Sequence, residues 1–139
     1  MALNVTLLAV VIVLLPMVYL FLASPAFLLV KLEIPQVAQL LRTMFFGYFA
    51  ALVVAGLLAA SLDAFDDHRA KALVIFSMTA FAVALRHWFL ARMDPLVQDI
   101  QAGVADAAPR LRRLHWVGMA TNAAQLGAFI VFIPHMISA

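Results

Sequence analysis

Long apolar stretches alternate with short polar segments along this chain. Residues 3–30 contain no aspartate, glutamate, lysine or arginine, and three further apolar stretches follow. A helix crosses the hydrocarbon core of a bilayer, about 30 Å thick, with roughly 20 apolar residues. The pattern therefore predicts an all-α, polytopic membrane protein with four transmembrane helices in an antiparallel bundle. The predicted spans are residues 3–30, 43–62, 72–91 and 113–133, within one integral membrane domain over 1–139.

Proline and aspartate mark where some predicted helices begin. Pro35 fits the first turn of the second helix, where its missing N–H costs nothing. Asp94 and Pro95 match an N-cap followed by the first residue of a helix. The apolar residues after them lie opposite Asp99 and Asp106 on a helical projection. We therefore expect a short interfacial helix between the third and fourth spans.

Composition and charge support a membrane location and suggest an orientation. Hydrophobic residues make up 67% of the chain and charged residues 12%, too few charges for the surface of a soluble domain. A net charge of +2 gives no basic surface for nucleic acid. The first and third loops with their flanks are the more basic, so the positive-inside rule predicts that they face the cytoplasm of an inner or plasma membrane, with both termini on the other side. Their basic residues are Lys31, Arg42, Arg92, Arg110, Arg112 and Arg113.

Small residues recur at helical spacing on two predicted helices and suggest surfaces where helices approach closely. On the second helix they fall every four residues: Gly47, Ala51, Ala55 and Ala59. On the third helix a small and polar face is formed by Ser77, Ala80, Ala84, His87 and Ala91. The lipid bilayer and a membrane-protein partner, or a second copy of the chain, are the partners that these surfaces predict.

Polar residues within the spans are the candidates for a functional site, because each is costly in lipid. One arc of the fourth helix carries His115, Gly118, Asn122, Gln125 and Phe129. His87 lies at a similar depth on the third helix, so His87 and His115 are candidate ligands for a haem iron, a metal or a quinone head group. Arg86 would then balance an anionic group and Asn122 would support the site. In the alternative interpretation, His115 and Asn122 point into the bundle and form interhelical hydrogen bonds that fix its register.

The chain contains no set of residues typical of a known reaction. It has no cysteine, no glycine-rich phosphate loop and no serine, histidine and acid set. The sequence therefore favours a non-catalytic accessory or scaffold subunit over an enzyme.

Several short motifs resemble those of a known family. They are Ser24-Pro25-Ala26-Phe27-Leu28-Leu29, Phe45-Phe46-Gly47-Tyr48-Phe49, Asp94-Pro95 and Leu111-Arg112-Arg113-Leu114-His115-Trp116 with Asn122. Together they are similar to the four-helix membrane family that includes transmembrane protein 205. Gly47 stands where that family has a proline, and Gly118 or Met119 falls near its serine. The resemblance implies a four-span bundle without established catalysis, and export of small molecules or metal drugs as another possible role.

Overall fold

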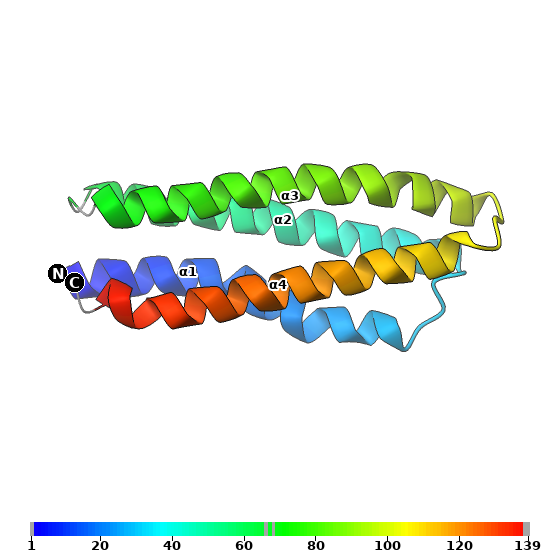
Figure 1. Cartoon of the computed structure of the whole chain (residues 1–139), viewed down its shortest axis with the longest axis horizontal. Helices are drawn as coiled ribbons and strands as arrows, with labels where there is room; N and C mark the ends of the chain where they lie inside the picture. Colours follow the sequence, from blue (N-terminus) through cyan, green and yellow to red (C-terminus); the bar gives the residue numbers. More distant parts are fainter. Residues whose placement is uncertain (1, 66, 68, 138–139) are drawn as a thin grey trace.

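The computed structural model describes residues 2–65, 67 and 69–137, and within them it consists of four long helices and one short 3-10 helix. The two termini and the turn between α2 and α3 lie at one end of an elongated bundle, and the other two connections lie at the opposite end (Figure 1). We call this second end the basic end, because it holds the basic residues of the first and third loops. The elements are α1 (Ala2–Ala23), η1 (Ser24–Leu28), α2 (Pro35–Phe65), α3 (Arg69–Gln101) and α4 (Ala107–Ile137).

The bundle is closed by neighbouring helix pairs. α2 packs along α3 in the most extensive of these pairs, and α1 packs on both α2 and α4. α4 also packs on α3, so the four helices surround one continuous core. Among its largest fully buried side chains are Phe45 of α2, Phe89 of α3 and Phe129 of α4.

The first predicted span is shorter as an α-helix than the apolar stretch suggested. α1 ends at Ala23 and is followed by the 3-10 helix η1, instead of continuing to residue 30. Pro25 lies in the first turn of η1, and it has no N–H for a bond to the carbonyl of Phe21. Apolar character therefore continues beyond the residue at which α-helical hydrogen bonding stops.

The prediction of a separate interfacial helix after Asp94 is wrong. α3 continues through Pro95 to Gln101. The Asp94 carboxylate accepts a hydrogen bond from Arg42 Nε at 2.9 Å and does not serve as a helix cap. The buried residues Met93, Val97 and Ile100 hold this last part of α3 against the core at a spacing of three or four. The carbonyl that Pro95 leaves unpaired belongs to Ala91, which is exposed and accessible to other donors.

Helix boundaries elsewhere follow local backbone chemistry. α2 begins at Pro35, as predicted. α3 and α4 are joined through Gly103, whose positive φ of 78° is easily reached by glycine. The turn between α2 and α3 includes Asp67 at φ 61°, one of the few non-glycine types that adopt this conformation readily.

Close helix approach occurs at glycines other than the one in the predicted stripe. A Cβ on Gly56 would overlap the hydroxyl of Thr79, so this position joins α2 to α3. A Cβ on Gly118 of α4 would lie 2.8 Å from the Phe45 ring. Gly47, by contrast, is exposed, and a Cβ added there would have no atom of another element within 4 Å. The predicted packing stripe on α2 is therefore internal only in its second half, at Ala55 and Ala59.

Candidate functional site

His115 is completely buried near the start of α4. Its Nε2 lies 3.1 Å from the carbonyl oxygen of Ser24 and 3.4 Å from the Ser24 hydroxyl. A carbonyl only accepts, so this contact assigns the proton to Nε2 and leaves Nδ1 as an acceptor. Nδ1 has no hydrogen-bond partner within the described part of the chain. The ring packs against Phe27 and Phe45, with centroids 6.2 and 5.8 Å away.

A second residue of α4 reinforces the same junction. Arg112 donates to the carbonyl oxygens of Leu28 at 3.2 Å and Val30 at 3.3 Å. The last carbonyls of a helix lack partners within that helix, and basic side chains commonly satisfy them. His115 thus binds the first residue of η1 and Arg112 binds its last residue and the chain just beyond it. This arrangement accounts for two polar residues of α4 without any ligand.

Asn122 joins three helices in the middle of the bundle. Tyr48 of α2 donates its hydroxyl hydrogen to Asn122 Oδ1 at 2.8 Å. Asn122 Nδ2 donates to the carbonyl oxygen of Met17 in α1 at 3.1 Å. Asn122 and Tyr48 are both buried. The amide is paired on its oxygen and its nitrogen, as the interhelical interpretation of Asn122 predicts.

The four residues proposed from the sequence as one cofactor site occupy different environments. His115 and Asn122 are buried on the inner face of α4, whereas His87 is exposed on α3. Arg86 is partly buried and its guanidinium carbon lies 4.8 Å from the centroid of the Phe46 ring. No contact between His87 and His115 is found among the described residues, and the two side chains differ in exposure. The described residues also contain no group of three or more histidine or acidic residues that could hold a metal ion.

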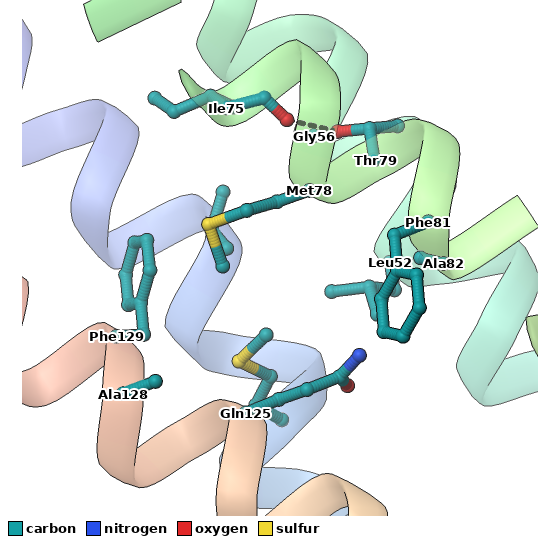
Figure 2. Close-up of a pocket in the computed structure, with 12 residues that line it drawn as sticks. Leu52, Gly56, Ile75, Met78, Thr79, Phe81, Ala82, Gln125, Ala128 and Phe129 are labelled. Carbon is teal, nitrogen blue, oxygen red and sulfur yellow. Dashed lines mark hydrogen bonds between the residues drawn. The ribbon is translucent and has the colours of Figure 1, made fainter.

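A cavity of about 110 Å³ lies deeper in the bundle and is bordered by all four helices (Figure 2). The side chain of Gln125 extends from α4 into this space, and Met78 of α3 and Phe129 of α4 also border it (Figure 2). Among the described residues, no hydrogen bond of the Gln125 amide is found. The rest of the lining is apolar except for Thr79, whose hydroxyl donates to the Ile75 carbonyl oxygen at 2.8 Å.

The cavity adjoins a groove between α3 and α4. This groove, of about 460 Å³, leads toward the end of the bundle that holds the termini and includes Lys71 and His135. Ile75, Met78, Ala128 and Phe129 line both spaces. The cavity therefore lies next to the side of the bundle between α3 and α4.

Some of these residues were not identified from the sequence. Tyr48 is the one side chain with a polar tip between Met44 and Ala60, which could have marked it as a partner for Asn122. Ser24 binds His115 through its backbone carbonyl, and every residue type has this group, so the sequence could not single it out. Phe46 looks like any lipid-facing aromatic residue until the position of Arg86 is known.

Comparison with known protein families, with curated proteins and with solved structures finds no match to this chain. The resemblance to the four-helix membrane family thus stays a prediction.

Proposed function

We propose that this protein spans a membrane four times and acts as a non-catalytic accessory or scaffold subunit. Four helices are long and apolar enough to cross a bilayer. From Lys71 to Trp88 the α3 axis rises about 26 Å, and from Trp116 to His135 the α4 axis rises about 28 Å, at 1.5 Å per residue. Tryptophan and charged residues mark the interfaces of a hydrocarbon core about 30 Å thick.

The same marks support an orientation. Beyond Trp88 and Trp116, α3 and α4 continue into the basic end, together with the start of α2. In the proposed antiparallel bundle this end faces the cytoplasm of an inner or plasma membrane, and both termini lie on the other side. The basic end then projects from the bilayer as a short helical extension with its own buried residues, which include Leu32, Leu41 and Leu111.

The observation that carries the scaffold role is the unused small face of α3. All five of its residues are exposed: Ser77, Ala80, Ala84, His87 and Ala91. Helix association in membranes depends on close packing and on hydrogen bonds across the interface, and small residues allow the required approach. A helix of a partner membrane protein, or of a second copy, can pack closely on this face. Ser77 and His87 carry polar groups, so the same helix can also form hydrogen bonds across the interface.

Cysteine cross-linking in native membranes tests this role. The chain has no cysteine, so Ala84→Cys introduces a single reactive site on the α3 face. Ala124→Cys, at an exposed alanine of α4, is the matched control. We expect Ala84→Cys to yield a defined cross-linked product and Ala124→Cys to yield little. Ala84→Leu should then reduce the amount of the cross-linked partner that co-purifies with the protein, whereas Ala124→Leu should not. Equal cross-linking at both positions would contradict a dedicated docking face.

The unpaired amide of Gln125 favours a second candidate role, in binding a lipophilic ligand. An amide without hydrogen bonds in an apolar surrounding is costly, and in lipid there is no water to satisfy it. A molecule that enters between α3 and α4 and carries a carbonyl or hydroxyl group would pair with this amide. The cavity at Gln125 is slightly smaller than the roughly 150 Å³ space that holds benzene in an engineered protein core.

Extraction of the purified protein tests the ligand role. We expect mass spectrometry of organic extracts to find one lipophilic compound that accompanies the wild-type protein and is lost from Gln125→Leu. Gln98→Leu changes an exposed glutamine of α3 in the same way and should retain the compound. If both variants carry the same extractable lipids as wild type, Gln125 has no ligand.

A further inference from the structure

Arg86 is a charged residue for which the described residues supply no counter-ion. Its guanidinium carbon lies 4.8 Å from the centroid of the Phe46 ring, a cation–π contact. Its Nε atom is buried without a hydrogen-bond partner. Within the part of the chain that the structure describes, no carboxylate pairs with Arg86. The ring stabilises the flat face of the guanidinium group. Because Nε is buried, the two Nη groups are the donors that a ligand can reach.

A second arginine shares the same ring. The guanidinium carbon of Arg42 lies 5.5 Å from the Phe46 centroid. Arg42 uses its Nε to bind Asp94 at 2.9 Å, so its own charge is balanced. Two guanidinium groups therefore share the Phe46 ring, and Asp94 balances the charge of one of them, which leaves one positive charge in excess.

The depth of the cluster follows from its neighbours and rests on the membrane placement proposed above. Trp88 is two residues from Arg86, and the guanidinium carbon of Arg92 lies 4.3 Å from a Trp88 ring. Tryptophan is enriched where hydrocarbon meets head groups. Arg86 thus lies at the interface of the basic end, where lipid phosphates are the most abundant anions.

We propose that Arg86 and Arg42, stacked around Phe46, bind the phosphate group of an anionic membrane lipid. Guanidinium groups present a planar set of donors that matches phosphate oxygens in a bidentate manner. Phe46 is itself exposed, so an acyl chain can lie against the ring while the phosphate meets the arginines. An anionic lipid balances the excess charge, which a zwitterionic lipid does not.

Native mass spectrometry of the protein released from nanodiscs measures this binding. The nanodiscs contain phosphatidylcholine alone or phosphatidylcholine with phosphatidylglycerol. We expect wild-type protein to retain phosphatidylglycerol selectively and Arg86→Gln to retain it about tenfold less, the factor that corresponds to the roughly 1.5 kcal/mol of a hydrogen bond to a charged group. Arg113→Gln removes the same charge from an exposed residue at the same end and should leave retention unchanged.

Additional variants separate a built site from general attraction and from poor folding. Phe46→Leu keeps an apolar side chain but removes the ring face, and it should weaken retention in part. Arg86→Lys keeps the charge and loses the planar donors, so it serves as the test if Arg86→Gln does not insert. Equal loss in Arg86→Gln and Arg113→Gln, or no loss in either, would overturn the proposal.

Two further readouts distinguish the source of the phosphate and the dependence on the scaffold role. Displacement of phosphatidylglycerol by inorganic phosphate would assign the site to a free anion and reject the lipid. If Ala84→Cys does not cross-link, the scaffold role is rejected but the lipid site still stands on the retention data. If alkaline extraction releases the chain from membranes, both the bilayer placement and the lipid site are rejected.

Discussion

Asn122 illustrates how a single buried amide can hold a helix bundle together. It accepts from Tyr48 and donates to the Met17 carbonyl, so α1, α2 and α4 meet at one side chain. Hydrogen bonds between membrane helices average about 0.6 kcal/mol and reach roughly 1.7. Asn122→Leu should therefore lower the free energy of unfolding by about 1 kcal/mol, measured by denaturation in mixed micelles. Asn122→Asp should cost about 3 kcal/mol, because it buries a charge near the centre of a span.

A double-mutant cycle isolates the Tyr48 contact. Tyr48→Phe removes one hydroxyl and leaves the ring in place. If the contact stabilises the fold, the effects of Tyr48→Phe and Asn122→Leu together should be smaller than their sum, because both remove the same bond. Additive effects would show that the two groups do not interact in the membrane.

His115 can be tested as a structural donor separately from any ligand role. His115→Phe keeps a planar ring and removes the N–H that binds the Ser24 carbonyl. Loss of this donor removes one hydrogen bond from the carbonyl that begins η1, which costs about 0.5–1.5 kcal/mol. We expect lower stability in mixed micelles and faster hydrogen exchange in η1, with no change in metal content or visible absorbance. Unchanged stability with loss of a bound metal or chromophore would reverse this assignment.

At the scale of helices, packing depends on which glycines have neighbours. Gly118→Ala should destabilise the bundle by about 1–3 kcal/mol, because its new methyl group overlaps the Phe45 ring in a filled core. Gly127→Ala is the matched control on the same helix, since nothing lies within 4 Å of its added Cβ. That control should be neutral or stabilising by up to about 1 kcal/mol. Thermal unfolding in detergent distinguishes the two, and equal effects would mean that α4 packs differently.

The helices themselves could be predicted from hydropathy, but some of their ends and faces could not. The four apolar stretches and the start of α2 at Pro35 follow from sequence alone. Continuation of α3 through Pro95 does not, because it depends on Arg42 binding Asp94 and on core contacts from distant parts of the chain. Local signals for a helix start are overridden there by tertiary packing.

The direction in which a predicted face points could be inferred from the sequence for α4, where polar residues are costly in lipid, but not for α3. The polar arc of α4 turned inward, where His115, Gly118, Asn122 and Phe129 are buried. The small face of α3, read by the same spacing, turned outward, so His87 was separated from His115. In a membrane protein lipid is as apolar as the core, so periodicity identifies a face without telling which side it occupies.

At the scale of the whole molecule, the distribution of charge along the bundle gives a testable orientation. The basic end holds both the first and the third connections, and the opposite end holds the termini and the turn at Asp67. From the positive-inside rule we expect the basic end to face the cytoplasm. Single cysteines at Asp67 and at Val104 report on opposite ends, because the chain supplies no other thiol and both positions are exposed.

A membrane-impermeant maleimide applied to intact cells should label Asp67→Cys and leave Val104→Cys unlabelled until the membrane is permeabilised. The outcome depends on the sum of many charges, so a single change such as Arg113→Gln should not alter it. Labelling of Val104→Cys alone in intact cells would invert the bundle while keeping four spans. Residues 67 and 104 flank α3, a single unbroken helix, so a transmembrane α3 must place them on opposite sides of the membrane. Labelling of both from the same side would therefore reject the transmembrane arrangement itself.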